Sequence, residues 1–137
     1  MNSNYNRLGN SRNIYQGTDK RVLCVCSAGL LRSPTAANVL HKEFGYNTRA
    51  CGVSEEYALI IFDEVLISWA DEIVFMDKEH HLMASNQYAQ SMKNKPIFIL
   101  GVPDKYKYMD PELQKLILKY YNDAKMIKKA KRAKRAV

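Results

Sequence analysis

The chain is predicted to form an α/β fold, a three-layer sandwich whose middle layer is a four-stranded parallel sheet. Four short runs, near residues 22–26, 47–51, 72–76 and 96–100, have the length of strands, and all but 47–51 are mainly apolar. Helical segments separate these runs, and strands that alternate with helices form a parallel sheet covered on both faces. A chain of 137 residues with 47% hydrophobic content is long enough to bury one core.

The first strand leads into a helix-start signal. Ser33 is predicted to be the N-cap and Pro34 the first helical residue, where its missing N–H costs nothing. We expect this helix over residues 34–44, with Gly45 ending it. Residues 1–20, before the first strand, are expected to be a polar arm.

Three more helices are expected later in the chain. Two of them are predicted over Tyr57–Ala70 and around residues 78–92. Asp110 has the local pattern of an N-cap for the last one. Apolar residues follow it at spacings of three and four: Leu113, Leu116, Ile117, Tyr120, Ala124 and Ile127. Residues 21–124 are therefore expected to form one domain, followed by a basic helix end or tail at residues 125–137.

Positive charge is concentrated at the end of the chain. The net charge is +7, and seven cations without an acid follow Asp123: Lys125, Lys128, Lys129, Lys131, Arg132, Lys134 and Arg135. The simplest interpretation is a solvated helix end whose cations favour the helix dipole. The alternative is an arm for nucleic acid, an acidic partner or an anionic membrane surface.

The sequence gives no sign of a membrane span, a metal site or a cofactor. No apolar run approaches spanning length, and the chain starts with polar residues, so we expect a cytoplasmic protein. Three cysteines form neither a disulfide framework nor a metal set, and Cys24 is expected to be a small buried hydrophobic residue. The pair His80-His81 lacks a metal-site pattern and is expected on a surface helix.

The segment from Cys26 to Ser33 is the most informative part of the chain. A thiol and a guanidinium enclose five small or apolar residues between a strand and a helix, so a tight loop can direct successive N–H groups at one point. Such a concavity binds a tetrahedral anion. The residues predicted to bind phosphate are Ser27, Ala28, Gly29, Leu30, Leu31, Arg32 and Ser33.

This placement favours nucleophilic chemistry at Cys26. A thiol ionises more readily beside a helix N-terminus, a fixed cation and several N–H donors. Arg32 can then hold two phosphoryl oxygens with its planar fork while the sulfur attacks phosphorus. Ser33 is suited either to donate to the sulfur or to cap the helix.

The motif Cys-x5-Arg-Ser-Pro after a short apolar strand resembles the low-molecular-weight protein tyrosine phosphatase family, in its short predicted-phosphatase branch. The similarity covers roughly residues 21 to 120. Residues 47–53 resemble the family's second strand and its ending, residues 69–76 its third strand, and residues 100–106 its aspartate loop. The resemblance implies a sheet with strand order 2-1-3-4.

The resemblance also implies a mechanism without a cofactor. Cys26 would form a cysteinyl-phosphate, Arg32 would bind the phosphate, and an aspartate would act as general acid. Asp104 is the first choice because Tyr106 completes the family's Asp-x-Tyr pattern, and Asp110 is the second. Tyr106 and Tyr108 are expected at the substrate entrance, and the expected substrate is a phosphorylated protein or a small phosphate ester.

Two positions depart from the family pattern. Gly29 replaces the usual asparagine, and Leu31 replaces a second cysteine found in many members.

Three other functions are alternatives to hydrolysis. A phosphocysteine carrier domain shares the Cys-Ser-Ala-Gly start, but Arg32 and an aspartate loop argue against it. Arsenate reduction would need further cysteines after Cys51, and none occurs. A non-catalytic module that binds phosphate or nucleic acid is the remaining alternative.

Overall fold

The sheet has four parallel strands in the order β2-β1-β3-β4. They are β1 (Arg21–Cys26), β2 (Asn47–Gly52), β3 (Glu72–Phe75) and β4 (Ile97–Ile99). The computed structural model describes residues 19–29 and 31–136, with residues 132–136 described as backbone. Residues 1–18 of the arm predicted at residues 1–20 lie outside the described residues. Leu30 also lies outside them. The predicted strand order and the parallel sheet are confirmed.

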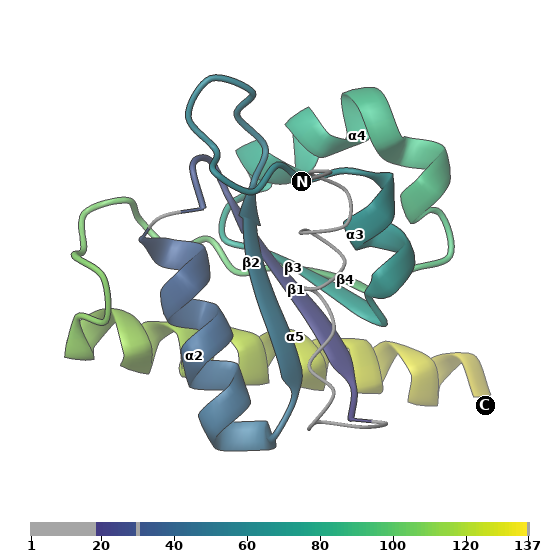
Figure 1. Ribbon diagram of the computed structural model, residues 1–137. Coiled ribbons are helices and arrows are strands. Elements are labelled where there is room, and N and C mark those ends of the chain that lie inside the picture. The colour runs from purple at the N-terminus through teal and green to yellow at the C-terminus, as the bar shows by residue number, and fades with distance from the viewer. Residues whose placement is uncertain (1–18, 30, 137) are drawn as a thin grey trace.

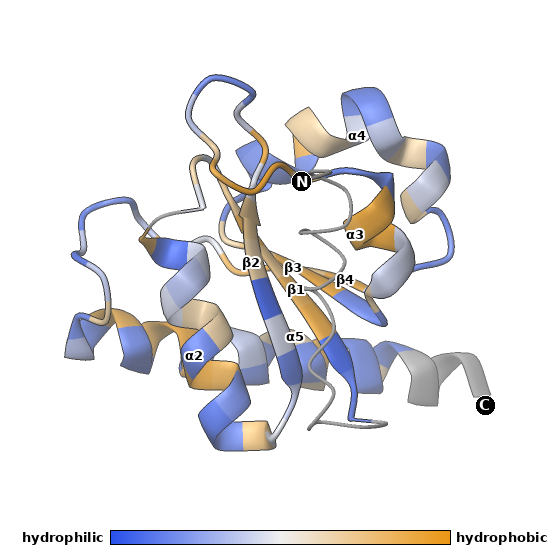
Figure 2. Cartoon of the chain, viewed as in Figure 1, coloured by the Kyte–Doolittle hydropathy of each residue, from blue (hydrophilic) through white to orange (hydrophobic). Residues whose placement is uncertain are grey.

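Helices cover both faces of the sheet, which gives three layers (Figure 1). One face carries α2 (Arg32–Phe44) and α5 (Pro111–Ala136), and the other carries α3 (Glu64–Trp69) and α4 (Lys78–Met92). Alternate residues of β1 enter the two cores, because successive strand side chains point to opposite faces. Cys24 is fully buried among apolar residues, as predicted. Figure 2 shows that the hydrophobic residues lie mainly on the central strands and on α3.

The start of α2 differs from the prediction. The helix begins at Arg32, its N-cap is Leu31, and no side chain in the described part of the chain caps it. The Thr35 hydroxyl donates to the Leu31 carbonyl at 2.7 Å. Ser33 is therefore inside the helix, so the N-cap prediction is wrong. Its hydroxyl instead contacts the end of β1, as described below.

The helix predicted over Tyr57–Ala70 is also too long. Only Glu64–Trp69 is helical, because the Asp63 carboxylate accepts from the N–H groups of Val65 and Leu66 and caps α3 there. The segment before Asp63 is used differently. Ile61 pairs with Gly52 in an isolated parallel bridge, which holds the end of this segment extended beside β2.

The last helix starts where the sequence predicts. Asp110 lies one residue before the helix, and its carboxylate accepts from the Glu112 N–H at 2.8 Å. The buried stripe of α5 consists of Leu113, Ile117 and Tyr121. The helix then continues to Ala136. The basic segment is therefore part of the same helix whose first turns pack on the core. The division into a domain and a basic tail stays a prediction.

The loop from Cys26 to Arg32 is held in place by the end of β2. The Val53 N–H donates to the Cys26 carbonyl at 3.0 Å, and the Ser54 N–H donates to the Ser27 carbonyl at 2.9 Å. Gly52 lies so close that an added Cβ would be 2.4 Å from the Ser27 carbonyl oxygen. Backbone thus packs directly on backbone at this crossing.

Gly29 faces the same crossing from the side of the loop. Its φ of 74° lies in the left-handed region, and a Cβ would be 2.9 Å from the Cys51 carbonyl carbon. The position that carries asparagine in the resembled family therefore has no room for a side chain here. The backbone bonds from Val53 and Ser54 brace the loop instead.

We expect Gly29→Ala to lower the free energy of unfolding by more than Gly45→Ala. Both glycines have positive φ, 74° and 72°, but a Cβ at Gly45 meets nothing within 4 Å. The conformational strain, about 1 kcal/mol, is common to both variants. The clash adds about 1–3 kcal/mol at Gly29 alone. Urea denaturation measures the difference, and equal losses in the two variants would show that the loop does not press on β2.

Candidate functional site

Cys26 lies at the carboxyl end of β1, the edge where parallel sheets usually bind ligands. Its Sγ accepts from the Gly29 N–H at 3.1 Å and lies 3.1 Å from the Ser33 Oγ. The residue is only 4% exposed, yet it lines an open cavity. The thiol is therefore enclosed by hydrogen-bonding groups on the protein side and reachable from the cavity.

Ser33 has one proton and two neighbours that can share it. Its Oγ donates to the Cys51 carbonyl at 3.2 Å, and in that state the Cys26 S–H is the donor between Oγ and Sγ. When Cys26 is ionised, the sulfur only accepts, and the hydroxyl can turn its proton to it. The hydroxyl thus has a partner in either protonation state of the thiol.

Arg32 is buried beside this loop and is held by three groups. Its Nη1 donates to the Val102 carbonyl at 3.0 Å, and its Nη2 lies 3.3 Å from the His80 Nε2. Its Nε is 3.6 Å from an Asp104 carboxylate oxygen. Since a guanidinium carries five N–H donors, these contacts fix its plane and still leave donors for an anion.

His80 is a member of this site that the sequence did not reveal. It was expected on a helix surface, but it is buried with 4% exposure, so that prediction is wrong. Burial, together with the Arg32 charge, lowers the pKa of His80 to about 4. The imidazole is thus neutral near pH 7. Its unprotonated Nε2 can accept from Arg32, while Nδ1 has no hydrogen-bond partner among the described residues. The one feature of the sequence that could have placed His80 near the site is its position in the first turn of the helix that follows β3, α4.

The loop after β4 brings Asp104 to the cavity. The Val102 N–H donates to the Met76 carbonyl at 2.8 Å, and the Met109 N–H donates to the Thr35 hydroxyl at 2.9 Å. These bonds tie both ends of the loop to the body. Between them, the Asp104 side chain is 67% exposed and lies over Arg32. Asp110, the second candidate acid, caps α5 and does not line the cavity.

The two tyrosines of this loop are not at the entrance. Tyr106 is only 7% exposed and packs in the core with α2 and α5, so the expectation that it lines the entrance is wrong. Tyr108 is exposed but does not line the cavity. An aromatic side chain from another loop, Tyr57, stands at the cavity instead. No sequence signal marked it, because it was assigned to a helix.

The cavity has a volume of about 320 Å³. It is lined by Cys26, Ser27, Ala28, Leu31, Arg32, Tyr57 and Asp104. Of the residues predicted to bind phosphate, Gly29 and Ser33 instead contact the sulfur, and Leu30 lies outside the described residues. Thiol, guanidinium and exposed carboxylate therefore meet at one opening.

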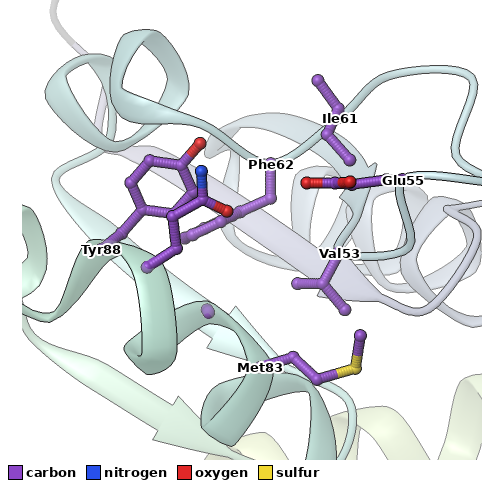
Figure 3. A pocket seen from close by; sticks show the side chains of 8 residues that line it. Val53, Glu55, Ile61, Phe62, Met83 and Tyr88 are labelled. Carbon is purple, nitrogen blue, oxygen red and sulfur yellow. The ribbon is translucent and has the colours of Figure 1, made fainter.

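A second, smaller cavity lies between α4 and the loop that follows β2 (Figure 3). Its volume is about 40 Å³, and its lining residues come from that loop and from α4: Val53, Glu55, Ile61, Phe62, Met83, Ala84, Gln87 and Tyr88. This set has no thiol and no cation. The larger cavity is therefore the candidate reaction site.

Within residues 19–29 and 31–136, no three His, Cys, Asp or Glu side chains are grouped closely enough to hold a metal ion. Over the same part of the chain, no helix is both long and apolar enough to cross a membrane.

The fold has counterparts among solved structures. The YwlE arginine phosphatase from Geobacillus stearothermophilus superposes with a TM-score of 0.57 at 19% identity, over 82% of this chain and 96% of that one. Vibrio vulnificus Wzb in complex with benzylphosphonate gives 0.61 at 18% identity, over 76% and 95%. The tyrosine phosphatase Wzb from Escherichia coli K30 in complex with phosphate gives 0.59 at 16%, over 77% and 96%.

Comparisons of the sequence itself find no relative. No protein-family model matches the chain, and no curated protein matches it. The structural likeness, at under one fifth identity for these three, establishes the fold. The chain therefore has the fold of the low-molecular-weight phosphatases, as the resemblance of its motifs implied.

The buried His80 predicts a loss of stability in acid. Its pKa is about 4 in the folded state against about 6.5 when unfolded, so between pH 6.5 and about 4 the unfolded state binds the proton more readily than the folded state. Stability should fall as the pH drops from 6.5 to 4, by on the order of 3 kcal/mol from this group. Urea denaturation between pH 7 and 4.5 measures it, and His80→Gln should flatten this part of the slope. His81→Gln is the matched control, and equal flattening there would refute the assignment to His80.

Proposed function

We propose that the protein is a cysteine-dependent phosphate monoester hydrolase of the protein tyrosine phosphatase type. The observation that carries this proposal is the convergence of Cys26, Arg32 and Asp104 on one cavity of about 320 Å³. A nucleophile, a cation for the phosphoryl oxygens and an exposed carboxyl group are the parts that such hydrolysis needs. The fold shared with known phosphatases supports the same conclusion.

The reaction begins at the sulfur. The Cys26 thiolate attacks phosphorus, an S–P bond forms, and the bond from phosphorus to the ester oxygen breaks. Gly29 N–H and the Ser33 hydroxyl, both near 3.1 Å from Sγ, stabilise the anionic sulfur before attack. The electron pair of the broken bond goes to the leaving oxygen, which then needs a proton.

Asp104 supplies that proton. Its side chain is 67% exposed at the cavity, whereas the Asp110 carboxylate is engaged with the N–H at the start of α5. In the second step the Asp104 carboxylate accepts a proton from water as the water oxygen attacks phosphorus. The S–P bond breaks, inorganic phosphate is released and the thiolate is restored.

Arg32 and the loop N–H groups stabilise the charge on the three equatorial oxygens. The contacts of Arg32 with Val102 and His80 hold its guanidinium in one orientation before substrate arrives. Because these two acceptors are neutral, they orient the cation without cancelling its charge. Preorganised charge of this kind costs no rearrangement during the reaction.

The cavity wall favours an aryl phosphate. Tyr57 and Leu31 line it and are 67% and 43% exposed, which offers an aromatic and an aliphatic surface to a substrate ring. The similar structures include arginine as well as tyrosine phosphatases. We infer that phosphotyrosine in a protein is the substrate, and that the protein acts in the cytoplasm, where its three free thiols stay reduced.

Cys26→Ser should abolish turnover of p-nitrophenyl phosphate, by at least ~10³-fold in kcat, because the reaction loses its nucleophile. Release of p-nitrophenol measures it, with vanadate as a competitive inhibitor of the native chain. Circular dichroism checks that the variant folds. A single burst followed by stable phosphocysteine in the native chain would instead show a phosphate carrier, and no product at all would show a binding module.

Asp104→Asn should lower kcat by about 10²-fold or more, because the leaving oxygen loses its proton donor. The loss should be larger for phenyl phosphate than for p-nitrophenyl phosphate, whose leaving group needs less protonation. Asp110→Asn is the matched control, since asparagine caps helices as well as aspartate does. The reverse ranking of the two variants would make Asp110 the acid.

A further inference from the structure

The amino-terminal edge of the sheet has a second cationic feature, which the proposed hydrolysis does not use. Residues 1–124 carry 14 basic and 14 acidic side chains, so the whole net charge of +7 comes from residues 125–135. These residues continue α5, which runs to Ala136. In Figure 1 the C-terminal turns of α5 extend past the adjacent ends of the strands. The charge is therefore presented on a helix that projects from the body.

A notch lies where this helix leaves the sheet. It has a volume of about 130 Å³ and is lined by Lys20, Glu72, Pro96, Phe98, Lys125, Lys128 and Lys129. Its one carboxylate is already paired, because Glu72 accepts from Lys20 at 2.7 Å and from the Tyr121 hydroxyl at 2.6 Å. The other charged groups at the notch are lysines, so it attracts anions.

Aromatic residues hold two of these lysines in place. The Lys125 Nζ donates to the Tyr46 hydroxyl at 3.0 Å, and the Lys128 Nζ lies 4.5 Å from the centre of the Phe98 ring. Lys129 and Lys131, farther along the helix, are exposed. The notch thus combines positioned ammonium groups with neighbouring exposed ones.

We propose that this notch and the turns of α5 from Lys125 to Lys131 bind the phosphodiester backbone of nucleic acid. The lysine ammonium group is a point charge that can donate to phosphate oxygens from several directions. Protein interfaces are depleted in lysine, which argues against an acidic protein. Repeated phosphates along one strand match several cations along one helix.

A lipid surface fits this part of the molecule less well. The large apolar side chains exposed there are Met126 and Ile127, at 68% and 57%. Two such residues give little insertion into a bilayer. The notch lysines also lie in the angle between helix and sheet, where a flat surface has poor access. A single flexible strand or a duplex edge can reach them.

The two anion sites are far apart. Lys20 precedes β1 and Cys26 ends it, so the strand separates them by roughly 20 Å. A nucleic acid in the notch therefore leaves the cavity with Cys26 open. It tethers the protein on a polyanion while the thiol acts on another molecule.

Fluorescence anisotropy with a labelled 20-nucleotide single-stranded DNA and the matching duplex tests the proposal on the full chain. The variant Lys128→Gln, Lys129→Gln, Lys131→Gln should bind at least tenfold more weakly at 100 mM salt. The slope of log Kd against log salt should fall by about 2 to 3, since three phosphate contacts are lost. Turnover of p-nitrophenyl phosphate should stay unchanged, which checks folding independently of DNA.

A variant with the same loss of charge is the control. Lys107→Gln, Lys115→Gln, Lys119→Gln removes three exposed lysines away from the notch and should leave affinity within about twofold. Equal weakening in both triple variants would show that only net charge matters and would overturn the site. Tighter binding of polyglutamate, or of vesicles with 30% phosphatidylserine, than of either DNA would overturn nucleic acid as the partner.

Discussion

The contact between the Cys26–Arg32 loop and the end of β2 is the constraint on which the rest of the site depends. At Gly29 and Gly52 the two backbones approach so closely that neither residue has room for a Cβ. Two backbone hydrogen bonds, from Val53 and Ser54, join the same segments. The loop therefore takes its shape from a neighbouring strand. This explains how it keeps its form without the asparagine of the resembled family.

The buried Arg32 guanidinium has two neutral hydrogen-bond partners at the site. A buried guanidinium is costly unless it is hydrogen-bonded. The Val102 carbonyl and the neutral His80 ring satisfy Arg32 and leave its charge intact, while the Asp104 carboxylate stays largely in solvent. No buried carboxylate among the described residues therefore cancels the Arg32 charge, which the proposed function needs for binding phosphate.

The parallel sheet separates the two proposed anion sites. Its carboxyl edge gathers the loops that carry Cys26 and Asp104, and its amino edge meets α5 near Lys20. The cavity is built from backbone N–H groups, one guanidinium and a nucleophile, which suits a single phosphoryl group. The notch is built from lysines on a helix, which suits a repeating charge. One strand, β1, connects the two and fixes their separation.

Local sequence determined the elements and their order, because strand length, helix spacing and the Asp110 cap depend on near neighbours along the chain. It also identified the strand, loop and helix that hold Cys26 and Arg32, whose pattern is contained in eight consecutive positions, Cys26–Ser33. Only the tertiary structure decided the roles of His80, Tyr57 and Tyr106. Arg32 contacts His80, which is 48 positions away in the sequence, and Val102, which is 70 positions away. Local periodicity carries no information at such sequence separations. Packing of separate elements, and the burial that follows, brought these residues to the site or removed them from it.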